Sequence, residues 1–184
     1  MRAQRVGVLA LQGDFEAHAK LLRRLGAEPV EVRVPAHLAD LGALVIPGGE
    51  STVMSLGIER EGLAEPLRQL AQSGKPVLGT CAGMIMLDRA HLGVLDVQAE
   101  RNAFGRQLRS FEAELELTGL DGGPLHAVFI RAPWVSDYGP QVEILAAVDG
   151  HPVAVRQGNL VAVAFHPELT GDARLHALAL GLGS

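Results

Sequence analysis

Cys81 is the residue of this chain best placed to act as a nucleophile. It is the only cysteine among 184 residues, and it lies in Gly79-Thr80-Cys81-Ala82-Gly83, directly after a short apolar run. This G-x-C-x-G spacing is the thiol form of the nucleophile elbow, a sharp turn between a strand and a helix that exposes the reactive atom. The two glycines leave room for such a turn. A buried, unreactive cysteine is the competing interpretation of this segment.

A histidine and a carboxylate follow another apolar run, Leu160–Ala164. They are His166 and Glu168, in the segment Phe165-His166-Pro167-Glu168. In extended chain, side chains two residues apart point the same way, so Glu168 can accept a hydrogen bond from one ring nitrogen of His166. The other ring nitrogen is then available to the sulfur. Thiol, imidazole and carboxylate in this order are the machinery of acyl-transfer enzymes that form covalent intermediates.

A glycine pair follows the apolar run 43–46, in Pro47-Gly48-Gly49-Glu50-Ser51. Glycine lets a backbone N–H point into a cleft, so the N–H of Gly49 and that of Ala82, the residue after the cysteine, can form an oxyanion hole. One such donor typically lowers a reaction barrier by roughly 3 kcal/mol. The alternative is an ordinary loop before a helix, with Glu50 or Ser51 as its cap.

The elements that position these segments alternate strand and helix in the first half of the chain. Strands are expected over 6–11, 29–34, 43–46 and 76–78, and helices over 15–25 (capped by Asp14), 38–41, from 51 and over 63–71. This order predicts an α/β fold, an open, mostly parallel, twisted sheet with helices on both faces. Short links between expected strands over 107–117, 128–130, 142–148, 153–155 and 160–165 predict additional antiparallel strands in the second half. A helix capped by Asp172 closes what we expect to be one domain, 1–184.

Composition excludes several classes of function. The net charge of −5 argues against a nucleic-acid partner, and no apolar stretch reaches the length of a membrane span. The histidines and the single cysteine lack metal-binding spacing, and neither a P-loop nor a dinucleotide fingerprint occurs, so we expect no metal and no cofactor. One cysteine and the lack of a leader-like N-terminus predict a cytoplasmic protein.

Taken together, the elbow, the distal H-P-E and the upstream P-G-G-E-S resemble the class I, triad-type glutamine amidotransferases, which have a flavodoxin-like sheet. More narrowly, the chain is similar to the glutaminase-subunit family of the pyridoxal 5′-phosphate synthases. Further segments carry this resemblance, namely 7–13, Glu100–Gln107 and Phe129–Pro133. Ile85 stands where other triad glutaminases usually have glutamine, as it does in the pyridoxal phosphate branch.

The resemblance implies the reaction and the residues. Cys81 attacks the side-chain amide carbon of L-glutamine, His166 oriented by Glu168 moves the proton, and a γ-glutamyl thioester hydrolyses to L-glutamate. The N–H groups of Gly49 and Ala82 stabilise the oxyanion. Implied to hold glutamine are Gly48, Gly49, Glu50, Arg101, Ile130 and Arg131.

The resemblance also implies a partner, because this chain has no second catalytic domain to use the ammonia. The expected partner is a (β/α)8-barrel synthase subunit in a large hetero-oligomer that makes pyridoxal phosphate, with glutamine turnover weak until the synthase docks. Gln12 and its loop are candidate contacts. Three alternatives stay open, namely a stand-alone γ-glutamyl cysteine hydrolase or peptidase, a non-catalytic scaffold subunit, and an amidotransferase subunit that serves a different synthase.

Overall fold

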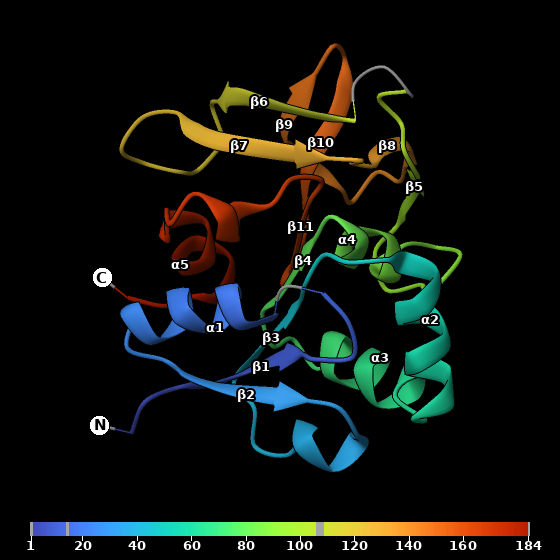
Figure 1. Cartoon of the computed structure of the whole chain (residues 1–184), viewed down its shortest axis with the longest axis vertical. Helices are drawn as coiled ribbons and strands as arrows, with labels where there is room; N and C mark the ends of the chain where they lie inside the picture. Colours follow the sequence, from blue (N-terminus) through green and yellow to red (C-terminus); the bar gives the residue numbers. More distant parts are fainter. Residues whose placement is uncertain (1, 14, 106–108, 184) are drawn as a thin grey trace.

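A seven-stranded sheet forms the centre of the molecule in the computed structural model, which describes residues 2–13, 15–105 and 109–183 (Figure 1). Its strands run in the order β2-β1-β3-β4-β11-β10-β9. The bounds are β1 Arg5–Leu9, β2 Glu28–Val32, β3 Ala43–Ile46, β4 Val77–Thr80, β9 Glu143–Val148, β10 His151–Gln157 and β11 Leu160–Val163. Neighbouring strands from β2 to β11 are parallel, whereas β10 is antiparallel to β11 and β9 to β10. The predicted mostly parallel sheet with later antiparallel strands is therefore confirmed.

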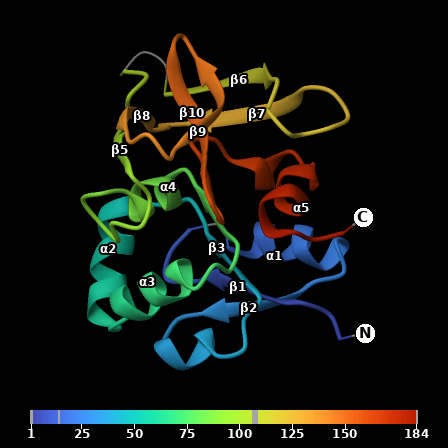
Figure 2. The same cartoon turned by 180° about the vertical axis from the view of Figure 1, so that it is seen from behind.

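Helices cover both faces of this sheet, as Figures 1 and 2 show from opposite sides. On one side lie α1 (Phe15–Arg24) and α5 (Arg174–Leu180), and on the other lie α2 (Ser51–Arg60) and α3 (Ala64–Gln72). The short helix α4 (Ala82–Leu87) packs on α2 and on the central strands β3 and β4. The central strands β3, β4 and β11 are buried along their whole length, which is why almost all of their residues are apolar.

Two small antiparallel sheets lie together at the top of Figure 1. One pairs β5 (Val97–Glu100) with β8 (Trp134–Tyr138), and the other pairs β6 (Ser110–Leu115) with β7 (Leu125–Ile130). Strand β7 joins the main body next to β11, because the backbone N–H of His166 donates to the carbonyl of Val128 at 2.9 Å. The rings of Phe129 and Phe165 pack edge to face beside this bond. These contacts hold β7 over the carboxyl end of β11.

Most expected elements exist, with shifted ends. The helix expected over 38–41 is a 3-10 turn, η1 (Pro35–Leu38), because proline favours the first helical position. The strands β5 and β8 were not expected, since each is short and half exposed and neither carries a long apolar run. No helix in the described part of the chain is both long and apolar enough to span a bilayer.

The residues expected to cap helices differ in whether the structure places them as caps. Asp14 and the start of the strand expected at 107 lie outside the described residues. At α5 the N-cap is Ala173, although Asp172 does accept a hydrogen bond from the N–H of Arg174 at 3.0 Å. Glu50 caps α2, since its carboxylate accepts from the N–H groups of Thr52 and Val53.

Gly83 lets α4 approach β3, and its replacement tests this packing. A methyl group on Gly83 would lie 1.9 Å from the carbonyl oxygen of Ile46, a backbone atom that cannot easily move away. We expect Gly83→Ala to lower the free energy of unfolding by about 2 kcal/mol or more, as overpacking does.

The matched control is Gly57→Ala in α2. There the nearest atom to a methyl group would be Cδ1 of the Leu11 side chain, at 3.3 Å, and alanine favours the helix. Urea unfolding should show Gly57→Ala close to or above wild type. Equal stability of wild type and Gly83→Ala would contradict the account of α4.

Candidate active site

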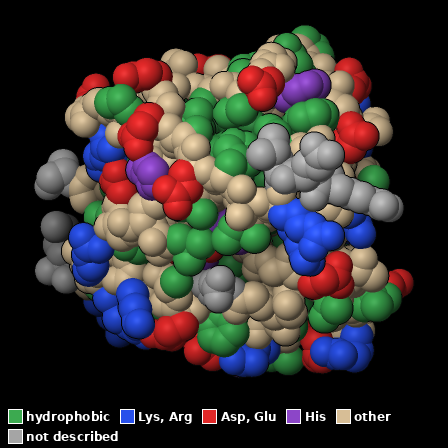
Figure 3. All heavy atoms as spheres, turned by 45° about the horizontal axis from the view of Figure 1, so that its top comes forward, with side chains coloured by type: hydrophobic (Ala, Val, Ile, Leu, Met, Phe, Trp, Pro, Cys, Tyr) green, Lys and Arg blue, Asp and Glu red, His purple; other side chains and the backbone are tan. Residues whose placement is uncertain are grey.

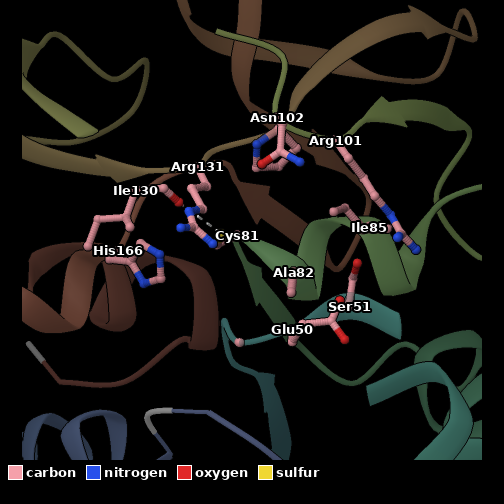
Figure 4. Close-up of a pocket in the computed structure, with 12 residues that line it drawn as sticks. Glu50, Ser51, Cys81, Ala82, Ile85, Arg101, Asn102, Ile130, Arg131 and His166 are labelled. Carbon is pink, nitrogen blue, oxygen red and sulfur yellow. Dashed lines mark hydrogen bonds between the residues drawn. The ribbon is translucent and has the colours of Figure 1, made fainter. Parts of the chain in front are cut away.

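The three predicted segments meet at the carboxyl ends of three neighbouring parallel strands. The glycine pair follows β3, Cys81 follows β4 and His166 lies three residues after β11. Because β3 and β11 flank β4 in the sheet, their carboxyl ends lie side by side. This edge is where ligands bind in open α/β sheets. Figure 4 shows the labelled residues around the cavity that results.

Cys81 occupies a strained turn, as the elbow pattern predicts. Its backbone has φ 51° and ψ −109°, values that non-glycine residues seldom adopt. The N–H of Cys81 donates to the carbonyl of Val163 in β11 at 2.8 Å, which anchors the turn to the sheet. A methyl group on Gly79 would lie 2.8 Å from the backbone of Gly83, so the elbow closes tightly only because residue 79 is glycine.

His166 and Glu168 form the buried pair expected from their spacing. The Nδ1 atom of His166 lies 2.7 Å from Oε1 of Glu168, and both residues are buried. A methyl group on Gly48 would lie 2.7 Å from Cε1 of His166 and 3.3 Å from Cβ of Cys81, so that glycine lies against both. Burial alone would lower the pKa of His166, but contacts with Cys81 and then Glu168 outweigh it and raise the pKa to about 10. The imidazole is thus hydrogen-bonded to the carboxylate and lines the same cavity as the thiol.

Hydrogen bonds to the side chains of Gln12 and Glu50 hold the loop that contains the glycine pair. Gly49 has φ 144°, in the region that favours glycine. The next N–H, that of Glu50, donates to Oε1 of Gln12 at 2.6 Å. The pKa of Glu50 is lowered by hydrogen bonds from the N–H groups of Thr52 and Val53, with a further contribution from the charge of Arg101. The carboxylate of Glu50 therefore caps α2, and Glu50 shapes the loop.

The thiol opens onto a cavity of about 440 Å³. Most of the predicted site residues line it, namely Gly49, Glu50, Cys81, Ala82, Arg101, Ile130, Arg131 and His166. Figure 4 shows Ile130, Arg131 and His166 across the cavity from Glu50 and Arg101. Gly48 and Glu168 do not line the cavity, since Gly48 packs behind it against His166 and Glu168 lies behind the imidazole. The volume is sufficient for an amino acid of the size of glutamine.

Two arginines belong to this cavity. Nη1 of Arg101 donates to the hydroxyl of Thr52 at 3.0 Å, which places its side chain near α2. Arg131 follows β7 with φ 45°, an unusual value for arginine. Sγ of Cys81 lies 4.0 Å from the carbonyl oxygen of Ile130, so the thiol faces the end of β7. Both guanidinium groups are available to bind a carboxylate at the cavity wall.

Some residues of the site were not predicted from the sequence. Ser51, Ile85, Asn102 and Pro133 complete the lining of the cavity. Behind Glu168, the buried histidines His18 and His176 lie in contact with each other. A signal was present for His18, because it falls on the buried face of α1 beside Ala19 and Leu22. Within the described residues, no group of three or more metal-ligating side chains is placed to hold a metal ion.

Figure 3 shows one face of the molecule with its side chains coloured by type. Hydrophobic side chains gather near its centre, and basic and acidic side chains surround them. Several large hydrophobic side chains are exposed among the described residues, namely Val53, Leu56, Ile130, Tyr138 and Leu169. Two of these, Ile130 and Leu169, lie in the segments that carry the cavity wall and the H-P-E motif.

Comparisons with known proteins agree with one another. The profile of the SNO glutamine amidotransferase family matches residues 8–180. The chain is 54% identical over 187 residues to the pyridoxal 5′-phosphate synthase subunit PdxT of Frankia alni, covering 97% of this chain and 94% of the relative. It is 55% identical to the subunit of the same name from Acidothermus cellulolyticus, covering 97% and 93%. A solved structure described as a glutamine amidotransferase superposes with a TM-score of 0.89 at 49% identity, covering 96% of this chain and 97% of that one.

The raised pKa of His166 can be measured, and the cause of the shift can be tested. In the wild-type protein we expect the His166 ring to stay protonated well above pH 7 in an NMR titration of ¹⁵N-labelled histidine. Glu168→Gln removes a charge and an acceptor, whereas burial remains, so the pKa of His166 should fall. His126 is the internal control, because its pKa is raised by Glu114 and Glu112 on the surface and should not change. An unchanged His166 titration in Glu168→Gln would show that the carboxylate does not hold the ring.

Proposed function

The chain belongs to the SNO glutamine amidotransferase family, and we propose that it is the glutaminase subunit of a pyridoxal 5′-phosphate synthase. It hydrolyses L-glutamine to L-glutamate and ammonia. Relatives named as that subunit are more than half identical to it over nearly the full length of both chains. The proposed function therefore rests on family membership and on the chemistry of the cavity that contains Cys81.

The observation that carries the proposal is the alignment of three groups at one edge of the sheet. The Cys81 turn is bonded to β11 at Val163 and His166 follows β11, and both residues line the same cavity. The imidazole in turn is bonded to Glu168 at 2.7 Å. This is the order of nucleophile, base and orienting carboxylate that acyl transfer requires.

The proposed chemistry follows from this order. His166, whose pKa is raised, already holds the proton of the thiol, so Sγ of Cys81 attacks the amide carbon of glutamine as a thiolate, and the carbonyl oxygen becomes an oxyanion. Collapse of this intermediate breaks the C–N bond, and His166 gives its proton to the departing ammonia. Water, activated by His166, then attacks the γ-glutamyl thioester and releases glutamate and the thiol. Glu168 keeps the imidazole in one orientation throughout.

The oxyanion is proposed to bind between the backbone N–H groups of Gly49 and Ala82. Ala82 begins α4 directly after the nucleophile, and Gly49 lines the same cavity. The α-carboxylate of glutamine is assigned to the arginines of the cavity wall, Arg101 and Arg131. Gly48, Glu50 and Ile130 shape the rest of the glutamine pocket, Gly48 by allowing close approach to the imidazole.

The proposed partner is a (β/α)8-barrel synthase subunit, with which this chain assembles into a large hetero-oligomer. Ammonia released here needs an acceptor, and the relatives are named as subunits of a synthase. We further propose that docking turns the Gly48–Gly49 peptide into its active orientation. The hydrogen bond from the N–H of Glu50 to Gln12 fixes this loop in the isolated chain. The synthase is proposed to change the loop by contacting the segment around Gln12.

Cys81→Ala separates ammonia production from ammonia use. We expect the variant to lose glutamine-dependent pyridoxal phosphate synthesis by at least about 10³-fold, because no other thiol is present. Synthesis from added ammonium salts should continue at the wild-type rate, because the partner carries that chemistry. His166→Asn should be nearly as severe for glutamine use, and Glu168→Gln milder. Full glutamine-dependent activity of Cys81→Ala would exclude the thioester.

Docking is tested by measuring ammonia release from glutamine with the purified chain alone and after adding the cognate synthase. We expect turnover to rise at least about tenfold on assembly, since one oxyanion donor is typically worth that much or more. Equal rates with and without the synthase would contradict the switch. Such a result, together with turnover of γ-glutamyl peptides, would favour the stand-alone hydrolase.

A further inference from the structure

A buried pair of histidines lies behind the carboxylate of Glu168, and the chemistry above does not use it. His18 of α1 and His176 of α5 are both completely buried. Nδ1 of His18 lies 2.8 Å from Nε2 of His176, and Nε2 of His18 lies 3.5 Å from Oε2 of Glu168. A row of polar side chains therefore extends from Glu168 of the triad to His18 and then to His176.

Both of these histidines are neutral. Burial lowers the pKa of His18 well below its ordinary value, and the neighbouring imidazoles of His176 and His166 further disfavour a charge there. Burial lowers the pKa of His176 to about 4 despite the opposing effect of Asp172. A neutral imidazole carries one N–H donor and one bare nitrogen acceptor, so the pair has two possible tautomeric arrangements.

The surroundings distinguish the two arrangements. If His18 carries its proton on Nδ1 and donates to His176, its bare Nε2 faces Oε2 of Glu168, so two acceptors oppose each other. The proton of His176 is then on Nδ1, which is buried and has no partner. If His176 instead donates from Nε2, His18 carries its proton on Nε2 and directs it toward the carboxylate. Only a bare nitrogen of His176 then lacks a partner.

The second arrangement also satisfies the carboxylate. Oε1 of Glu168 is bonded to His166, but Oε2 is buried and has no hydrogen-bond partner within ordinary distance. Leaving a buried acceptor unsatisfied costs about 1–3 kcal/mol, more for a charged group. The hydroxyl of Thr80, 3.3 Å from Nε2 of His18, can pair with that nitrogen in either tautomer and so does not decide between them.

We propose that His18, held in its Nε2–H tautomer by His176, is a positioning residue for the catalytic carboxylate. It holds Oε2 of Glu168 so that Oε1 stays directed at His166. This inference rests on the proposed function, because it assigns a role within the same site. The separation of 3.5 Å is long for an N–H···O bond, as catalytic hydrogen bonds often are before substrate binds.

A neutral donor suits this place better than a charged one. The protonated ring of His166 is an imidazolium whose charge is balanced by Glu168. A lysine or arginine at the position of His18 would compete for that carboxylate and repel the imidazolium. Neutral His18 supplies an N–H without a net charge, and its contact with α5 fixes the ring between two helices.

The tautomer can be measured directly in the full chain labelled with ¹⁵N-histidine. Long-range ¹H–¹⁵N NMR spectra at neutral pH should show both His18 and His176 protonated on Nε2, with bare Nδ1 nitrogens. Single-histidine variants assign the signals. A proton on Nδ1 of His18 overturns the inference whatever the activity, so this result does not depend on turnover.

Kinetics of the assembled synthase give the second readout. We expect His18→Leu to lower kcat for glutamine about 10- to 100-fold with KM nearly unchanged, because it misorients the base and leaves the pocket intact. His18→Gln retains an N–H donor and should recover most of the loss. His91→Leu is the matched control, since it breaks a contact between a histidine and a buried aspartate, Asp88, away from the cavity.

The outcomes separate the two proposals. Ammonium-dependent synthesis at the wild-type rate shows that each variant folds and assembles. A wild type that releases no ammonia from glutamine would defeat the proposed function. An active wild type with an equally active His18→Leu, or with His18→Gln no better than His18→Leu, would defeat only the role of His18.

Discussion

The backbone turn at Cys81 is the constraint on which the rest of the site depends. A positive φ at a residue with a side chain is a strained conformation that typically costs about 1–3 kcal/mol, and packing around it must supply the difference. Here that packing comes from the bond of the Cys81 N–H to Val163 and from the close approach of Gly79 and Gly83. The same bond ties the nucleophile to the strand that leads to His166. The geometry of the thiol and of its base is therefore set by one sheet rather than by two independent loops.

Starting from the Cys81 turn, each group of the site is held in place by the next group along the chain of contacts. The sheet places the thiol, β7 and the Phe129–Phe165 contact hold the segment that carries His166, and Glu168 orients its ring. In the proposed arrangement, the buried histidines of α1 and α5 then hold Glu168. Helices on one face of the sheet are thereby linked to chemistry at its edge, which gives a physical reason for buried polar groups in an otherwise apolar layer.

Much of this could be predicted from the sequence, because it depends on local pattern. The apolar run and glycine spacing around Cys81 predict the elbow, and the two-residue spacing of His166 and Glu168 predicts their contact. The order of strands and helices predicts the parallel sheet that brings these segments to one edge. What could not be predicted depends on contacts between distant segments. Examples are the pairing of β5 with β8, the tether from Gln12 to the glycine loop, and the meeting of His18 with His176 across 158 positions of sequence.

The central claim is that Cys81 attacks the amide carbon of glutamine, and covalent labelling by a glutamine analogue tests it most directly. The analogue 6-diazo-5-oxo-L-norleucine carries a ketone in place of the amide carbonyl and, in place of the amide nitrogen, a diazomethyl carbon that alkylates a thiol with loss of N2. Mass spectrometry of the assembled synthase treated with it should find one adduct per chain, on the peptide that contains Cys81, with glutamine protecting against labelling. Absence of an adduct on Cys81, or labelling that glutamine does not slow, would contradict the account.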